Sequence, residues 1–153
     1  KRIKKEDKMM YIDVMTNLKN RNFLNDNMEL WESNTVYPQA IIVIDLIDVS
    51  EINDIYGHEE GDRQIKAAAN ILINTQRENS EIIRTDGNEF LVYMIGYDEK
   101  VITTYLHKLN KEFKTLPYQK GVTFGYSMIT DNIKTIDDAI NDALNMMRES
   151  KGE

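Results

Sequence analysis

A continuous apolar run places the strongest limit on how this chain can fold. The run QAIIVID, residues 39–45, follows Pro38 and ends in an aspartate. It lacks the alternation of apolar and polar residues that marks a strand with one face in water. It therefore predicts a central β-strand buried on both faces, inside a sheet that other elements cover on each side.

The patterns around this run predict the rest of an α/β sandwich. Residues 20–34 have helical spacing and an apolar face that consists of Phe23, Leu24, Met28 and Trp31. After the strand we expect a short helix, a turn bounded by Gly57 and Gly61, a longer helix, strands over 81–85 and 89–95, a helix over 98–115, a strand over 121–129 and a helix over 135–150. The order β-α-α-β-β-α-β-α predicts an α/β fold, an α+β sandwich with helices flanking a central antiparallel or mixed sheet.

The strand over 121–129 has one expected packed face. In GVTFGYSMI the larger side chains alternate with smaller ones. We therefore expect the larger set to face the core, and it consists of Val122, Phe124, Tyr126 and Met128.

The composition fits one soluble domain. The chain has 153 residues, 41% of them hydrophobic, and no apolar run approaches the roughly 20 residues that span a bilayer. Cysteine is absent, which excludes thiolate chemistry and is compatible with a reducing, cytoplasmic location. The net charge of −7 argues against nucleic acid as a partner. The negative charge does not exclude a small phosphate-bearing ligand, because a divalent cation can bridge carboxylates and phosphates.

The basic stretch KRIKKEDK stands at residues 1–8. We expect residues 1–12 to be a solvated linker helix from a longer chain, in preference to a segment that contacts a membrane surface, and residues 13–153 to be a single domain. A membrane contact is expected only through a missing N-terminal part.

Three polar side chains, Asp86, Asn88 and Glu89, gather at the bend between the strands of IIRTDGNEFLVYM, residues 82–94. If this hairpin lies beside the first strand, Asp45 comes close to Asn88 and Glu89. Carboxylates from two strands could then share a divalent metal ion.

The chain resembles the GGDEF family, the diguanylate cyclases that join two GTP molecules into cyclic di-GMP. DVMTNLKNRNF, residues 13–23, is similar to the family's D-x-L-T-G-L-x-N-R, and IDLIDVSEINDIYGHEEGD, residues 44–62, to its D-x-D-x-F-K-x-x-N-D-x-x-G-H-x-x-G-D. RTDGNEF, residues 84–90, stands where R-x-G-G-D-E-F belongs. The resemblance covers nearly the whole chain and implies the palm-like fold of nucleotidyl cyclases.

Asn53 and Asp62 match the residues with which the family reads guanine. An amide can pair with the purine edge, and a carboxylate can accept from the ring N–H and the exocyclic amine. Taken without the family, Asn53 would be a helix-end cap and Asp62 the N-cap of a helix after Gly61.

The resemblance implies a damaged metal site for Mg²⁺ or Mn²⁺. Asp45 matches one metal carboxylate, and Glu89 matches the second acidic residue of the signature, the catalytic one if the domain is active. The other metal carboxylate falls on Asn88, whose neutral amide oxygen is a poorer ligand. Ile47 replaces the second Asp of D-x-D, and Asp48 is expected to N-cap the next short helix instead.

The phosphate side also departs from the family pattern. Ser50 stands in place of the family's Lys and Val49 in place of its Phe. Asp86 replaces the first Gly of the signature and brings a negative charge to where phosphates would lie. Arg148 stands near the place of the family's C-terminal Lys, although it would equally suit pairing with the helix dipole.

The inhibitory motif of the family is incomplete in this chain, and the two histidines indicate no catalytic role. The register of the inhibitory R-x-x-D motif gives RENS, which keeps Arg77 without its Asp, so Arg77 is a remnant of that site. His58 matches the family's G-H and is expected to be a structural turn residue. His107 falls on an ordinary helix, so the pattern indicates no histidine-based catalyst.

Three readings follow. In the first, a degenerate GGDEF domain has lost its cyclase activity and serves as a guanine-nucleotide-responsive or protein-interaction module, with a protein partner or a second copy of itself. In the second, the remaining carboxylates support an active or weakly active cyclase. In the third, the domain is a structural interaction module without a ligand. The changes at Ser50, Asp86 and Asn88 favour the first reading.

Overall fold

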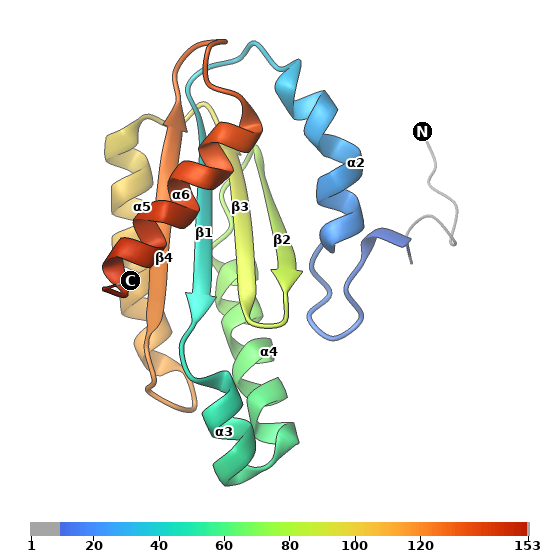
Figure 1. The fold of residues 1–153 in the computed structure, drawn as a ribbon, viewed down its shortest axis with the longest axis vertical. Helices are drawn as coiled ribbons and strands as arrows, with labels where there is room; N and C mark the ends of the chain where they lie inside the picture. Colours follow the sequence, from blue (N-terminus) through green and yellow to red (C-terminus); the bar gives the residue numbers. More distant parts are fainter. Residues whose placement is uncertain (1–9, 153) are drawn as a thin grey trace.

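The computed structural model describes residues 10–152 of the chain. Its elements are α2 (Arg21–Glu32), β1 (Gln39–Leu46), α3 (Val49–Tyr56), α4 (His58–Asn74), β2 (Ser80–Asp86), β3 (Glu89–Ile95), α5 (Glu99–Glu112), the 3₁₀ helix η1 (Phe113–Thr115), β4 (Val122–Ile129) and α6 (Ile136–Ser150), as Figure 1 shows. The predicted order of elements is confirmed. The basic stretch lies outside the described residues, so the linker expected over 1–12 stays a prediction.

The strands form one antiparallel sheet in the order β2-β3-β1-β4. β1 lies inside this sheet, between β3 and β4, and the apolar side chains from Ala40 to Ile44 are at most 1% exposed. A strand in this position must be apolar on both faces because helices cover both. The central strand predicted from the apolar run is therefore confirmed.

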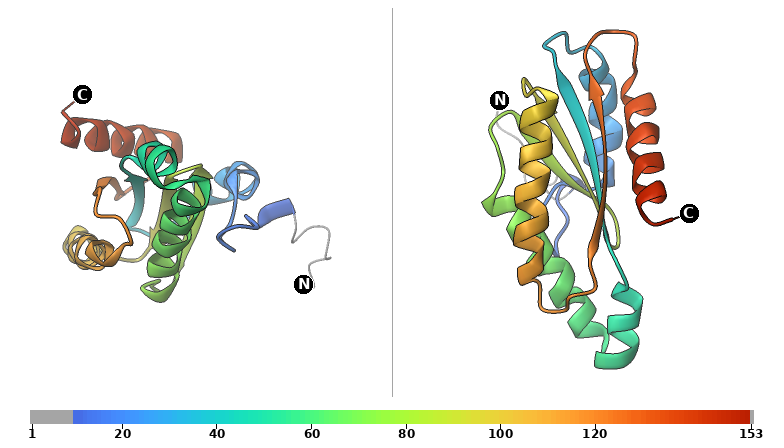
Figure 2. Two further views of the ribbon diagram at one scale, coloured as in Figure 1. Left: turned by 90° about the horizontal axis from the view of Figure 1, so that it is seen from below. Right: turned by 90° about the vertical axis from the view of Figure 1, so that its left-hand side faces the viewer.

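Two layers of helices cover the sheet (Figure 2). Side chains of α4 and α5 pack with Ile42, Ile44 and Phe90 on one face. Side chains of α2 and α6 pack with Ile41 and Val43 on the other. Adjacent residues of β1 thus serve opposite layers, as the two-residue period of a strand requires. Within the described part of the chain, no helix is both long and apolar enough to cross a bilayer.

The larger side chains of β4 face the core as predicted, because Val122, Phe124, Tyr126 and Met128 pack against the cluster that α4 and α5 cover, and the opposite face of the strand is buried as well. Gly125, Ser127 and Ile129 are the buried residues of this strand, whereas the larger side chains on the alternate positions are only partly buried. α6 lies so close to β4 that a Cβ at Gly125 would be 1.8 Å from the carbonyl oxygen of Ala143. The small residues mark the closest approach of a helix, a role that side-chain size alone does not reveal.

The turn expected between Gly57 and Gly61 is shorter than predicted. α4 begins at His58, so Gly57 alone, with φ of 103°, separates it from α3. Gly61 and Asp62 lie inside the helix. The polar segment HEEGD resembles a loop in sequence, but α3 and α4 pack against each other and keep it helical.

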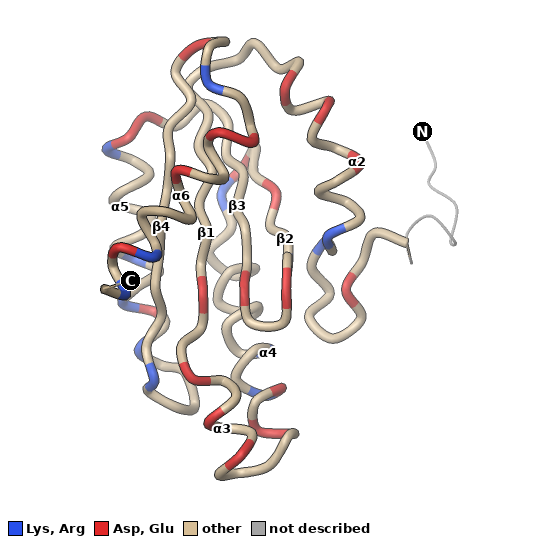
Figure 3. The backbone as a smooth tube through the Cα atoms, in the orientation of Figure 1, with Lys and Arg blue, Asp and Glu red and all other residues tan. Residues whose placement is uncertain are grey.

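One end of the sheet gathers the residues of interest. The end of β1, the bend between β2 and β3, and helix α3 lie together at the lower end of the molecule in Figure 1. Figure 3 shows acidic segments side by side at the ends of β1, β2 and β3. The topology therefore brings negative charge from separate parts of the sequence to one place.

Candidate functional site

The end of β1 and the start of β3 bring the predicted carboxylates together. Asp45 is paired with Glu89 in the antiparallel register, and directly opposite residues place their side chains on the same face of a sheet. Asn88 lies next to them, and its Nδ2 donates to Oδ1 of Asp45 over 3.0 Å. The proximity of these three residues that the strand order predicted is confirmed.

Asn88 is a hydrogen-bond donor toward this carboxylate. Its Nδ2 also donates to the carbonyl oxygen of Leu46 over 2.8 Å. A flipped amide would set its oxygen against two acceptors, so the network fixes the NH₂ group toward Asp45. The Asp45 carboxylate therefore contacts the NH₂ group of Asn88 at the place where a metal site would have a further oxygen ligand.

Lys151 is a residue of this site that the sequence analysis missed. Its Nζ forms an ion pair with Oδ2 of Asp45; the side chain of Lys151 is 25% exposed and that of Asp45 is 16% exposed, while Lys151 as a whole residue lies at the surface. The predicted cation, Arg148, instead donates to Oδ1 of Asn145 over 3.3 Å and is exposed. Because Lys151 follows Arg148 by three residues, a search for cations one turn further along the helix would have found it.

The donor set does not fit a divalent cation as the residues stand. Glu89 accepts a hydrogen bond from Oγ1 of Thr85 over 2.8 Å, and both oxygens of Asp45 already have partners. In the part of the chain that the structure describes, no three His, Cys, Asp or Glu side chains are placed to hold a metal ion. Mg²⁺ requires several oxygen ligands, and an ammonium and an amide N–H group stand in their place.

A pocket of about 710 Å³ adjoins this end of the sheet. Residues from α3, α4 and the hairpin line it, among them Asp48, Ser50, Asn53, Asp62 and Asn88. The structure thus places both predicted guanine readers, Asn53 and Asp62, on one cavity. Asn88 joins the pocket to the carboxylate pair, because it lines the pocket and also bonds to Asp45.

Asn53 carries a buried oxygen without a partner. Among the described residues, Oδ1 of Asn53 is the buried side-chain atom that has no hydrogen bond. The carboxamide occupies space left by Gly61, where a Cβ would lie 1.7 Å from this oxygen. A buried acceptor without a donor lowers the stability of the fold. Its presence is therefore better explained by a functional role than by folding.

The capping roles considered for Asp62 and Asn53 are wrong, whereas Asp48 does occupy its predicted N-cap position. Asp62 lies inside α4, so it is not an N-cap. Asp48 occupies the N-cap position of α3 with φ of 60°, but its side chain makes no capping hydrogen bond. Asn53 lies within α3 and is not its end cap either. All three side chains instead line the pocket.

The phosphate side of the site offers little positive charge. Ser50 lies exposed in the first turn of α3, and Val49 is buried beneath it. The carboxylate of Asp86 is exposed at the bend, where its Oδ1 accepts from the backbone N–H of Gly87 over 2.8 Å. Arg84 is a cation on the pocket wall, but its guanidinium already donates to the carbonyl oxygen of Gly87 and to the carboxylate of Asp13.

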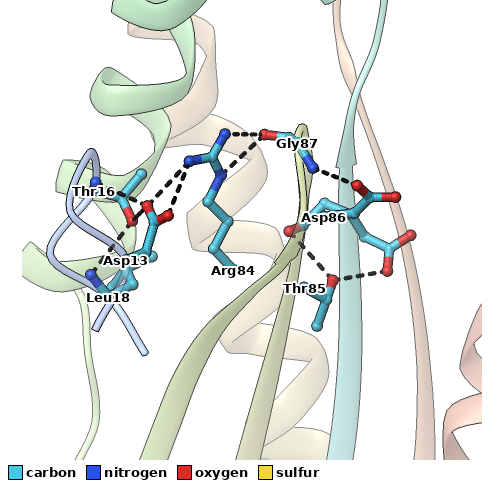
Figure 4. Close-up of polar contacts among 8 residues, drawn as sticks. Asp13, Thr16, Leu18, Arg84, Thr85, Asp86 and Gly87 are labelled. Carbon is cyan, nitrogen blue, oxygen red and sulfur yellow. Dashed lines mark hydrogen bonds and ion pairs between the residues drawn. The ribbon is translucent and has the colours of Figure 1, made fainter. Parts of the chain in front are cut away.

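Arg84 links the hairpin bend to the loop that precedes α2 (Figure 4). Its Nη2 donates to the carbonyl oxygen of Gly87 over 2.8 Å, and its Nη1 donates to Asp13 over 3.0 Å. Asp13 also accepts from the backbone N–H and the hydroxyl of Thr16, so its side chain caps the turn that precedes α2. Burial raises the pKa of Asp13, but the hydrogen bonds from Thr16 and Arg84 and the charge of Arg84 hold it below its usual value.

This lowered pKa predicts a pH-dependent contribution to stability. The Asp13 carboxylate stabilises the fold above about pH 4, near its unfolded pKa, and the contribution is lost as the pH falls through the lower, folded pKa. We expect Asp13→Asn to lower the free energy of unfolding by roughly 1–2 kcal/mol near pH 7 and by progressively less in acid. Urea unfolding at several pH values measures it. Glu29→Gln, on the exposed face of α2, is the control, and a loss that does not depend on pH would contradict the prediction.

The remaining candidate residues are Arg77, His58 and His107. Arg77 lies over the ring of Tyr97, 5.1 Å from its centroid, in a cation–π contact. His58 begins α4 and lines the pocket. His107 lies on α5 as expected.

Comparisons with known proteins agree with the fold and the motifs. The profile described as "Diguanylate cyclase, GGDEF domain" matches residues 10–153. The probable diguanylate cyclase DgcJ of Escherichia coli K12 is 28% identical over 115 residues, which cover 73% of this chain and 23% of that protein. The uncharacterized membrane protein SSP1970 of Staphylococcus saprophyticus is 28% identical over 99% of this chain and 45% of its own length. The chain thus spans less than half of either relative.

A solved structure shows the same fold. The GGDEF domain of DgcB from Caulobacter crescentus, in complex with c-di-GMP, superposes with a TM-score of 0.82. It is 21% identical, and the match covers 99% of this chain and 93% of that one. At this identity the likeness concerns the fold.

Proposed function

Because the chain belongs to the GGDEF domain family, we propose that it is a guanine-nucleotide-responsive domain of bacterial cyclic di-GMP signalling that has lost diguanylate cyclase activity. Its ligand is GTP or a related guanine nucleotide. It acts through a protein partner or a second copy of itself, and it works in the cytoplasm, where GTP is available. A relative described as a membrane protein supports a cytoplasmic domain of a membrane-attached protein as the context.

The unpartnered Oδ1 of Asn53 is the observation that carries this proposal. Guanine presents N–H donors on its ring nitrogen and its exocyclic amine. Asn53 and Asp62 line the same pocket, and we assign the Asn53 carboxamide, whose oxygen is buried against Gly61, and the Asp62 carboxylate as the groups that receive them. Adenine lacks the ring N–H on this edge, so the acceptor pair favours guanine.

The surroundings of Asp45 support the loss of catalysis. Diguanylate cyclases of the family generally use Mg²⁺ or Mn²⁺, whereas Asn88 and Lys151 direct N–H groups to the Asp45 carboxylate. The pocket also lacks the lysine that the family places at Ser50. Without a divalent ion between them, the carboxylates of Asp45 and Glu89 leave the negative charge of a bound triphosphate without the compensation that a metal ion supplies.

Calorimetric titration with GTP, once with Mg²⁺ and once with EDTA, tests the proposal. We expect binding in both buffers with similar affinity, because the base contacts do not involve a metal. Asn53→Ala and Asp62→Ala should each weaken GTP binding by about tenfold or more, which is a loss of about 1.4 kcal/mol. ATP should bind more weakly than GTP. A parallel incubation with GTP and Mg²⁺ or Mn²⁺ should yield no cyclic di-GMP.

The controls separate a binding role from a structural one. Asn70→Ala changes an exposed asparagine of α4 and should leave GTP binding unaltered. Asn53→Ala removes an unsatisfied buried acceptor, so it should cost little stability. Formation of cyclic di-GMP that Glu89→Ala abolishes would identify a working cyclase. Absence of GTP binding in both buffers would leave the interaction module without a ligand.

A further inference from the structure

The carboxylate of Asp45 already has a cation beside it. Nζ of Lys151 pairs with Oδ2, and the Nδ2 of Asn88 donates to Oδ1 over 3.0 Å. Asp45 and Lys151 are 16% and 25% exposed, so water solvates neither group fully. A partly buried carboxylate needs such partners, because an isolated charge there would be costly.

Packing fixes the backbone position of Lys151. Lys151 is the C-cap of α6, and its backbone N–H donates to the carbonyl oxygens of Met147 and Arg148 over 3.2 and 3.1 Å. α6 is seated on β4 at Gly125, where backbone and helix approach most closely. The helix therefore carries Lys151 to the end of β1, beside Asp45.

The ammonium also balances a pair of like charges. Asp45 and Glu89 are directly opposite in the register of β1 and β3, an arrangement that is unfavourable for two carboxylates without a counter-charge. In a metal-dependent site a divalent ion fulfils this need. Here Lys151 supplies one positive charge, and Asn88, being neutral, removes one negative charge relative to an aspartate at the same position.

We infer that Lys151 is the resident cation of this site and takes the place of a divalent metal ion. A metal ion at Asp45 would have to displace the ammonium and reverse the Asn88 amide, which would lose both of its hydrogen bonds. Lys151 and Asn88 thus form a matched pair that closes the site to Mg²⁺ and Mn²⁺. The inference does not depend on guanine binding by Asn53 and Asp62.

Titration with Mn²⁺ alone tests this inference without any nucleotide. Four proteins are compared by electron paramagnetic resonance of free Mn²⁺: the unaltered chain, Lys151→Met, Asn88→Asp and the double variant. We expect no binding to the unaltered chain at about 1 mM Mn²⁺ and binding to the double variant that is at least about tenfold tighter than to either single variant. The matched control is Arg148→Met, which removes an exposed cation from the same helix end and should leave the chain without Mn²⁺ binding.

Stability provides the second measurement. In EDTA the double variant places three carboxylates together, so its Tm should fall below that of the unaltered chain, and Mn²⁺ should raise it again. Lys151→Arg keeps the charge and should remain folded and without Mn²⁺ binding. If the double variant does not fold in EDTA, recovery of folded protein on addition of Mn²⁺ is the supporting result.

The unaltered chain itself can overturn the inference. Bound Mn²⁺ broadens the NMR signals of nearby amides, so selective broadening at Asp45 and Glu89 in the unaltered chain would show that the ammonium does not close the site. A double variant that is folded and fails to bind Mn²⁺ would overturn it as well. Either outcome leaves the proposal on guanine binding unaffected, because GTP titration in EDTA measures that separately.

Discussion

Gly125→Ala is expected to lower the free energy of unfolding by roughly 3 kcal/mol. A Cβ at this position would lie 1.8 Å from the carbonyl oxygen of Ala143 and 2.8 Å from the backbone nitrogen of Met147. Both atoms belong to the backbone of α6, so no side chain can turn aside, and the helix itself must shift away from β4. For a chain of this size the change corresponds to a fall in Tm of roughly 10 °C, measured by calorimetry or circular dichroism.

Gly87→Ala is the matched control for this prediction. A Cβ at Gly87 meets no atom within 4 Å, and its backbone does not have the positive φ that would strain an alanine. Replacing glycine at such a position usually stabilises a protein slightly, because the unfolded chain loses freedom. The two substitutions are chemically identical and should act in opposite directions. A Gly125→Ala variant as stable as the unaltered chain would show that α6 is not seated in this way.

The fold could be predicted because its main signals are local. The apolar run from Gln39 to Asp45 indicated a strand buried on both faces, and the bend at residues 86–88 between two extended runs indicated the hairpin beside it. The burial of the opposite face of β4 was not predicted, because the approach of the helix at Gly125 depends on α6, which is distant in sequence. Side-chain size indicates which residues fill space, but it does not show where a helix backbone needs space left empty.

The site was predictable where strand pairing determined it. Pairing of β1 with β3 necessarily brings Asp45 and Glu89 together, so their proximity followed from the order of elements. Lys151 could not be placed in this way, because its position depends on how far α6 extends and on its seat against β4. The N-cap role considered for Asp62 was wrong because helix α4 begins earlier than the polar sequence suggested, and Asp48 holds its predicted N-cap position without a capping side-chain hydrogen bond.

Gly61→Ala is expected to abolish most of the proposed GTP binding while preserving the fold. A Cβ at Gly61 would lie 1.7 Å from Oδ1 of Asn53, so the carboxamide must leave its position. This group is the far end of a flexible side chain, and alanine favours a helix over glycine by up to about 1 kcal/mol. We therefore expect an unchanged or higher Tm together with a loss of GTP affinity of about tenfold or more. Thermal unfolding and calorimetric titration measure the two effects separately.

A double-mutant cycle shows whether the loss of GTP affinity in Gly61→Ala arises from displacement of the Asn53 side chain. If Gly61→Ala acts by displacing the carboxamide, it should weaken GTP binding in the unaltered chain and add almost nothing in the Asn53→Ala background. Asn70→Ala, an exposed substitution on the same helix, should not alter either measurement. Losses that add in the double variant would mean that Gly61 contributes to binding by some route other than Asn53. A fall in Tm for Gly61→Ala would instead mean that the carboxamide is fixed by the fold, in which case its unpartnered oxygen is a structural defect and not an acceptor kept for guanine.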